Sequence, residues 1–456
     1  MKKANKIVKI LLLFSMVLLC VGFKLAAAPK PVAAEVDALA VWDGSIAAGF
    51  AGGDGTKESP YKISDGAQLA YLAQVVNVGN NPEYNSEDIY YELTNDIYLN
   101  DTSNWKNWNI YADADDAEKD GIRSWTPIGL YYIATADLSA AFMATFDGCD
   151  YVIRGIYIHT AEPIVNGYFG QYFQGLFGVV HSVGTVKNVG VEQSYLHGLT
   201  IGGIAGKVNG TLNGCYNSGD ISGERVGGVA GSVGEGVSRL INCYNAGTVL
   251  GTEVGGVAGY VGGIYGKGYI INCYNVGAVS VTGDNYNLAG GVVGYVNNGY
   301  IINCYNAGQV TDVSGNCFIG GLSGAIYERE AWINYAYYLE GSAGSGVYGK
   351  PDKPDILKFN IKGEFFGNDI NSVTMDDDDT ECFSLLDALN AWVEENQTDP
   401  VTYVAWIGAP FPGLDGIGTI PEFKPDPDKR GCNGGSAAVA GLTAVSMGLA
   451  IRRRYL

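Results

Sequence analysis

Short apolar runs, broken by glycine and asparagine, follow one another through the middle of the chain. The runs are rich in Val, Ile and Tyr, and none has the length or the apolar spacing of a helix. In residues 241–245, alternation puts Ile241 and Cys243 on one face of a strand, and Asn242 and Tyr244 on the other. The pattern therefore predicts strands joined by tight turns.

Two phrases repeat in this region at intervals of 25 to 35 residues. The first reads Gly-Gly-apolar-x-Gly and begins at Gly202, Gly227, Gly255, Gly290 and Gly320. The second reads Cys-Tyr-Asn-x-Gly and begins at Cys215, Cys243, Cys273 and Cys304. Such a period indicates a repeat architecture, and a propeller is disfavoured because its blades need four strands and about 40 residues. We expect an all-β solenoid, in which each unit is one rung of a parallel β-helix.

Stacked rungs align equivalent side chains in ladders, spaced by roughly 4.8 Å. The cysteines are expected inside as reduced thiols, since this spacing exceeds the Cβ separation of a disulfide, and a straight ladder cannot surround a zinc ion. We expect no cofactor. Asparagines are expected at a corner, where they bond neighbouring backbone and tolerate a left-handed conformation: Asn217, Asn245, Asn275 and Asn306.

The tyrosines of the repeated phrase are expected on the outside of the coil: Tyr216, Tyr244, Tyr274 and Tyr305. If these rings are exposed, they form an aromatic strip that could stack on sugars or pack against a partner. Alternatively, the rings stack on one another and stabilise the rungs, as cross-strand pairs do.

The two repeated phrases resemble the GLUG-type repeats of bacterial surface proteins, including regions of large peptidases that cleave immunoglobulin A. The resemblance extends upstream to Trp42-Asp43-Gly44-Ser45 and to Trp125-Thr126-Pro127. It implies a right-handed parallel β-helix on an exported, adhesin-like protein. The catalytic domain of the peptidases is not implied, because none of the three histidines, His159, His181 and His197, lies in an H-E-x-x-H motif.

Residues 1–34 predict a signal peptide, with basic residues, an apolar run and small residues in turn. Residues 421–436 predict a linker and a sorting motif, processed near Cys432, Gly434 and Gly435, and residues 437–456 an apolar segment ending in arginines. The tail resembles bacterial carboxyl-terminal sorting signals. Between these ends we expect N-terminal rungs in 35–174, repeat rungs in 175–340 and C-terminal rungs in 341–420. Apolar spacing predicts helices over 68–77 and 382–396 that cap the ends of the coil, while 100–123 predicts a polar loop.

The formal net charge of −20 argues against nucleic acid as a partner. We expect an extracellular, surface-anchored module that is no enzyme and serves adhesin-like binding or structural display. Its partners would be a glycan, a protein of a host or neighbouring cell, and the cell envelope at its C-terminal segment. The alternative is a carbohydrate-active β-helix enzyme, which would need paired carboxylates in one groove. The oligomeric state stays open.

Overall fold

The computed structural model describes residues 40–131, 138–160, 172–263, 266–283, 287–312, 315–326, 331–339, 341–343, 348–351, 364–366, 369–370, 385–397, 402–408 and 412–418. The predicted signal peptide, the tail, and Cys432, Gly434 and Gly435 lie outside these residues. Among the residues described, no helix is both long enough and apolar enough to cross a membrane. All of them belong to one compact unit that ends at Pro421.

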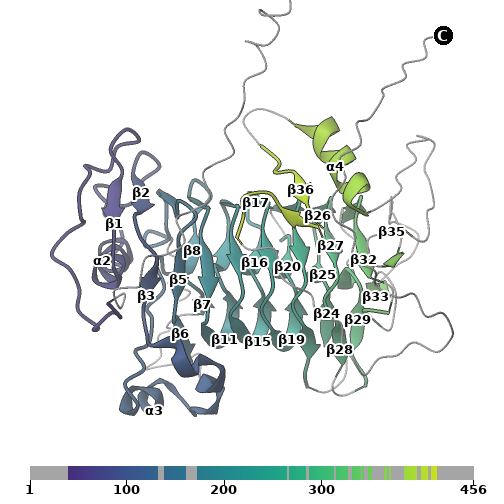
Figure 1. Cartoon of the computed structure of the whole chain (residues 1–456), viewed down its shortest axis with the longest axis horizontal. Helices are drawn as coiled ribbons and strands as arrows, with labels where there is room; N and C mark the ends of the chain where they lie inside the picture. The colour runs from purple at the N-terminus through teal and green to yellow at the C-terminus, as the bar shows by residue number, and fades with distance from the viewer. Residues whose placement is uncertain are drawn as a thin grey trace, which may run out of the picture. The chain divides into compact units, whose positions relative to one another are not determined.

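One rung of the coil consists of four strands: β15 (Asp220–Gly227), β16 (Ala230–Val233), β17 (Val237–Ile241) and β18 (Tyr244–Asn245). Each strand pairs in parallel with the equivalent strand of the next rung, as Leu240 pairs with Ile270 and Tyr244 with Tyr274. The strands of successive rungs therefore lie side by side in four sheets (Figure 1). The prediction of a parallel β-helix is confirmed.

Each sheet is named here after its strand in that rung. The β17 sheet comprises β1 (Tyr61–Ile63), β2 (Tyr90–Leu93), β4 (Thr145–Asp147), β9 (Thr185–Lys187), β13 (Thr211–Asn213), β17, β21 (Lys267–Ile271), β26 (Gly299–Ile302) and β31 (Trp332–Asn334). The β18 sheet comprises β3 (Ile97–Tyr98), β5 (Val152–Arg154), β10 (Gly190–Glu192), β14 (Tyr216–Asn217), β18, β22 (Tyr274–Asn275), β27 (Tyr305–Asn306), β32 (Tyr337–Leu339), β34 (Glu364–Phe366) and β35 (Asp369–Ile370).

The other two sheets face them across the coil. The β15 sheet comprises β6 (Tyr157–His159), β7 (Phe173–Gln174), β11 (Tyr195–Gly202), β15, β19 (Val249–Gly255), β23 (Val279–Val281), β24 (Leu288–Gly290), β28 (Val310–Asp312) and β29 (Phe318–Gly320). The β16 sheet comprises β8 (Phe177–Val180), β12 (Ala205–Val208), β16, β20 (Ala258–Val261), β25 (Val293–Val296), β30 (Ser323–Ile326) and β33 (Tyr348–Pro351).

The interior of the coil is filled by apolar columns that run from rung to rung. Leu212, Leu240, Ile270 and Ile301 form one column and are fully buried. The cysteine column lies beside it, also fully buried and free of disulfides. Burial raises the pKa of the Cys215 and Cys273 thiols. The column packs as small apolar groups.

The corner between β17 and β18 is built by Asn242, which has a φ of +55°. Its equivalents in the next two rungs, Asn272 and Asn303, share this left-handed conformation. The corner breaks the alternation predicted for residues 241–245. Leu240 and Cys243 lie in the core cluster and Ile241 does not, so the prediction that Ile241 shares the face of Cys243 is wrong.

The four predicted corner asparagines form a separate, fully buried ladder. Asn245 Nδ2 donates to Asn275 Oδ1 at 2.9 Å and to the Gly247 carbonyl at 2.9 Å, while Asn245 Oδ1 accepts from the Gly247 amide. The same bonds recur at Asn217 and Asn275. These residues bond neighbouring backbone as predicted, but none of them has a positive φ, because the tight bend belongs to Asn242 and its equivalents.

The helix α2 (Gly66–Asn77) lies at the N-terminal end of the coil, beside β1 and β2 (Figure 1). Asp65 caps it by accepting from the Gln68 amide, and Leu69, Leu72 and Val76 join the core, so it covers the first rung as predicted. The predicted polar loop 100–123 instead contains the 3-10 helix η1 (Thr102–Ile110) and the helix α3 (Ala114–Lys119). Both pack against Tyr157 through Trp108, Ala117 and Ile122.

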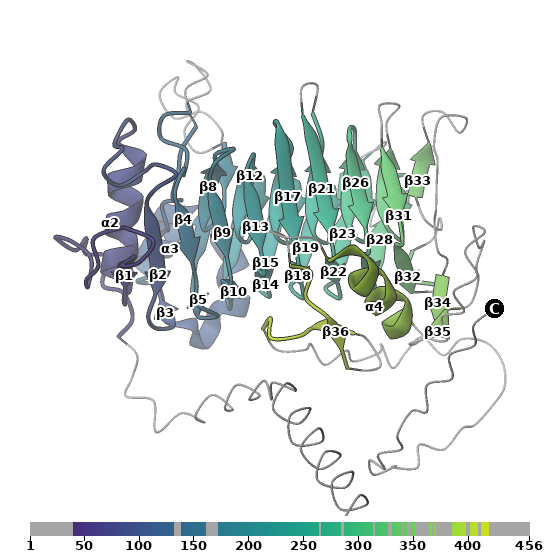
Figure 2. The same ribbon diagram turned by 90° about the horizontal axis from the view of Figure 1, so that it is seen from above.

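The helix α4 (Leu385–Asn396) lies within the second predicted helix but does not cap the end of the coil. Figure 2 shows α4 and the short strand β36 (Trp406–Ile407) along the side of the coil, and the Asn303 side chain donates to the Leu389 carbonyl. β36 pairs with β37 (Gly413–Leu414). The predicted position was wrong, because α4 lies beside Asn303 on the side of the coil.

We predict that Asn275→Ala lowers the free energy of unfolding by about 2–6 kcal/mol, because two buried neighbouring donors lose their acceptor, at about 1–3 kcal/mol each. The neighbours are the Asn245 amide and the Gly277 amide. Urea titration followed by circular dichroism measures the change. Asn95→Ala, at an exposed asparagine, is the control and should stay within about 0.5 kcal/mol of wild type. Equal effects of the two substitutions would contradict the prediction.

Candidate functional site

The four predicted outward tyrosines form one continuous stack. Neighbouring ring centroids lie 4.8, 4.8 and 5.2 Å apart, with interplanar angles of 2°, 11° and 6°. Their exposed fractions are 7% for Tyr216, 1% for Tyr244 and Tyr274, and 0% for Tyr305. The prediction of an exposed aromatic strip is therefore wrong. Each ring face is occupied by the next ring, which is the arrangement of the alternative, in which the tyrosines stabilise the rungs.

The stack is buried because the C-terminal part of the described chain lies over it. We call α4 with residues 402–408 and 412–418 the clip. Trp406 of the clip lies 5.6 Å from the Tyr274 ring and 5.5 Å from the Tyr305 ring. Its indole nitrogen donates to Asn272 Oδ1 at 2.7 Å, and the Tyr305 hydroxyl donates to the Pro412 carbonyl. Local sequence patterns carry no sign of this contact, because its partners are more than 100 residues apart.

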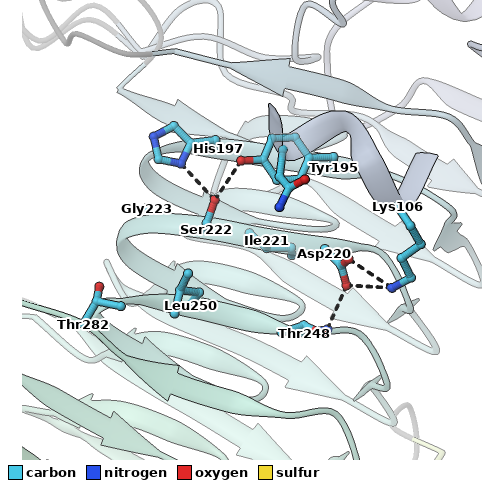
Figure 3. A pocket seen from close by; sticks show the side chains of 11 residues that line it. Lys106, Tyr195, His197, Asp220, Ile221, Ser222, Gly223, Thr248, Leu250 and Thr282 are labelled. Carbon is cyan, nitrogen blue, oxygen red and sulfur yellow. Dashed lines mark hydrogen bonds and ion pairs between the residues drawn. The ribbon is translucent and has the colours of Figure 1, made fainter. Parts of the chain in front are cut away.

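An open groove of about 430 Å³ lies on another face of the coil, on the outside of the β15 sheet. Its floor is formed by residues of β11, β15 and β19, and Lys106 of η1 lies at one side (Figure 3). Asn109 of η1 also lines the groove. Alternation explains which side chains line it: Leu196 and Ile221 have buried side chains in the core cluster, so Tyr195, His197 and Ser222 point outward.

In-register pairing places these outward residues in columns. One column runs through His159, His197, Ser222, Leu250, Ser280 and Thr311. A second begins with Tyr157, Tyr195 and Asp220. The groove thus crosses several rungs, and most of the side chains in it are uncharged groups that donate and accept hydrogen bonds.

The polar groups of the groove are joined in two small networks (Figure 3). His197 Nδ1 lies 2.9 Å from Ser222 Oγ, and the Tyr195 hydroxyl lies 3.5 Å from the same oxygen. Asp220 pairs with Lys106 Nζ at 3.0 and 3.1 Å and accepts from the Thr248 amide at 3.4 Å. The ion pair fixes η1 to the floor, since it joins residues 114 positions apart in the chain.

The two histidines of the first column have lowered pKa values, which favours the neutral ring at pH 7. Burial lowers the pKa of His197, and the neighbouring His159 lowers it further, with 4.8 Å between the ring centroids. Burial also lowers the pKa of His159, although Asp113 partly offsets this. A neutral His197 can therefore donate to or accept from Ser222 Oγ, whereas a protonated ring could only donate.

Two charged side chains, those of Lys106 and Asp220, line the groove. Among the residues that line the groove, Asp220 is the one carboxylate, and it is paired with Lys106. Glycoside hydrolysis usually needs two carboxylates on either side of the bond. Ser222 and His197 lie within hydrogen-bond distance, but no described carboxylate bonds the second ring nitrogen of His197, so the pair lacks the third member of a triad. No group of three or more metal-ligating side chains occurs in the described part of the chain.

Sequence reasoning noted the histidines but did not locate the groove. His159 lies upstream of the repeated phrases, and Lys106 lies in a segment predicted to be a loop away from the coil. Aligning the apolar residues before His159 and His197 would have placed the two rings in one column. The approach of η1 to Asp220 has no equivalent signal, since it depends on how η1 and α3 pack on Tyr157.

No protein-family model matches the chain. A provisionally named Gly-rich membrane protein of Evansella cellulosilytica is 32% identical over 147 residues, which are 32% of this chain and 12% of that protein. Halomucin of Haloquadratum walsbyi is 31% identical over 193 residues, which are 42% of this chain and 2% of that protein. The chain thus matches a small part of the length of each of these relatives.

A solved structure has the same architecture. It is that of a provisionally named immunoglobulin A1 protease from Bacteroides ovatus, which superposes with a TM-score of 0.50 at 20% identity and covers 80% of this chain and 95% of its own. At this identity the similarity supports the fold alone.

We predict that the protein loses stability as the pH falls from 7 to 5. The pKa values of His159 and His197 are lowered in the folded chain, so the unfolded chain takes up protons first. The contribution of the two neutral histidines to stability is fully present above their pKa in the unfolded chain. It is lost as the pH falls through their lower pKa in the folded chain. Urea midpoints measured against pH should show a smaller slope for His159→Gln/His197→Gln than for the wild-type chain. Burial also lowers the pKa of His181, so His181→Gln, which keeps the pair, should reduce the slope by less. Equal slopes would refute the assignment.

Proposed function

We propose that this protein is an exported β-helix that is displayed on the cell surface and binds a glycan in the groove over the β15 sheet. The observation that carries the proposal is the groove itself, which crosses several rungs and is lined mainly by uncharged hydrogen-bonding side chains. Such a surface suits an extended ligand rich in hydroxyl groups. Each hydroxyl group can donate to or accept from the side chains that follow one another along a column.

The groove offers the two kinds of contact that a sugar uses. Tyr195, His197 and Ser222 supply hydrogen bonds, and they do so from a rigid sheet, so little conformational entropy is lost on binding. Leu250, which is 36% exposed, supplies an apolar contact beside them. The Lys106–Asp220 pair adds a charged donor and a charged acceptor at the edge.

Surface display is supported by the relatives, one of which is named as a membrane protein and the other as halomucin. In this proposal, residues 1–34 direct export and the tail around Cys432, Gly434 and Gly435 holds the protein in the cell envelope. A protein of a host or neighbouring cell that carries the glycan would be the natural partner.

Binding is favoured over the alternative of a carbohydrate-active enzyme. The other ion-paired carboxylates described, such as Glu253 with Arg225 and Glu235 with Lys207, lie outside the lining of the groove. The groove therefore lacks the carboxylate pair that would favour cleavage.

The test is an array of glycans and matrix proteins probed with the full chain, with release of products followed on each polysaccharide. We expect saturable binding without cleavage. Tyr195→Ala/Ser222→Ala should weaken it at least about tenfold, because the lost hydrogen bonds and ring contact together exceed about 1.4 kcal/mol.

Ser280→Ala is the matched control, because Ser280 lies in the same column as Ser222 but outside the groove. It should bind like wild type. Binding that both variants retain would move the ligand to another surface, and product release from any polysaccharide would replace this proposal by the enzymatic one.

A further inference from the structure

The clip is held together by contacts of its own. The Asn390 side chain accepts from the Trp406 amide at 2.8 Å and donates to the Trp406 carbonyl at 2.9 Å. The Gln397 side chain bonds the amide and the carbonyl of Tyr403 in the same two-way manner, at 3.1 and 2.6 Å. Trp392 packs edge-on against Tyr403, with 4.9 Å between the ring centroids. The described residues of the clip therefore form a preorganised piece that presents Trp406.

The coil meets this piece with a column of side-chain amides, which we call the asparagine track: Asn242, Asn272 and Asn303. Asn242 donates to the Thr402 carbonyl at 3.0 Å and accepts from the Val404 amide at 3.1 Å. Asn272 donates to the Val404 carbonyl at 2.8 Å. Most of these bonds go to the backbone of the clip. The track therefore recognises an extended peptide, and the side chain that it selects is the indole of Trp406.

The fit between clip and track is incomplete. The Tyr274 hydroxyl and Asn303 Oδ1 are buried at this contact, and no described atom bonds either of them. Buried polar atoms without a partner cost free energy. By contrast, the ladder from Asn217 to Asn306 within the coil bonds each of its amides to the next rung or the adjacent turn. The contact of the clip is thus less completely bonded than this ladder.

We propose that the clip is exchangeable between molecules: it leaves its own coil, and the clip of a second copy docks on the freed asparagine track. A second copy is the occupant that the contacts specify, because it carries the same Trp406 and the same backbone groups. Residues 371–384, which connect β35 to α4, could reach about 50 Å if fully extended. Exchange of an identical element is a low-cost route to association, and it becomes competitive where copies are crowded, as on a cell surface.

Isotope-mixed photocrosslinking tests this exchange. Full chains grown on light and heavy nitrogen, each with Val404 replaced by p-benzoylphenylalanine, are mixed, equilibrated at rising protein concentration and irradiated. Peptides that join the clip to Asn242 or Asn272 are then read by mass spectrometry. We expect the share of light-to-heavy products to rise with protein concentration toward one half, the share that random pairing of equal amounts of light and heavy chains would give. Products that stay entirely light-to-light and heavy-to-heavy at every concentration would overturn the proposal.

Trp406→Ala should lower the light-to-heavy products at least about fivefold, because it removes the indole bond to Asn272. Trp332→Ala is the control, since Trp332 lies over Tyr300 on the β17 sheet and should leave the products unchanged. If both variants gave equal amounts of light-to-heavy product, the molecules would be in contact without using the asparagine track, and the proposal would be overturned. A further outcome would also overturn the proposal. If an added unrelated peptide displaces the clip from the asparagine track and no light-to-heavy product forms, the track binds a foreign ligand and not a second copy.

Discussion

Every side chain in this coil has to be compatible with its own counterpart one rung away. In-register parallel pairing imposes this constraint, and the residues that fill the columns are those that satisfy it. An amide is both donor and acceptor, so the asparagines of the ladder from Asn217 to Asn306 bond one another from rung to rung without leaving a buried group unpaired. Tyrosines do so through their ring faces, with centroids 4.8 Å apart, and aliphatic residues through simple contact. Because like charges would repel in such a column, charged residues are left to the outside, where they form pairs such as Arg225 with Glu253.

The features that depend on residues close together in the repeat could be predicted from the sequence. The strands, the inward cysteines, the stacking position of the tyrosines and the helix α2 all follow from spacing and alternation, which act over a few residues. The corner did not follow, because two asparagines of one phrase, Asn242 and Asn245, are chemically alike and one of them takes the left-handed conformation. Telling them apart requires knowing which residue ends a strand.

Features built from distant segments also escaped prediction. The clip meets the coil through Trp406 and Asn272, and the groove is completed by Lys106 and Asp220, pairs that no local pattern connects. Both features use the same logic, however. A column of equivalent side chains on the coil provides a regular surface. A segment outside the repeats then adds one side chain, Trp406 in the clip or Lys106 at the groove, that distinguishes one part of this surface from the rest. The groove remains open to a ligand, while the tyrosine column is closed by the protein's own chain.

The clip also changes where tension would enter the molecule. The described chain ends at Gly418, close to the Tyr244 hydroxyl, and Ile417 lies near Gly214, so it leaves the coil beside rungs in its middle. A force applied at Gly418 would therefore act on Trp406 and the amides of the asparagine track together, across several rungs. The force would therefore not unfold the final rungs of the coil one after another. A force applied to the flank of a solenoid in this way is opposed in shear by many bonds at once.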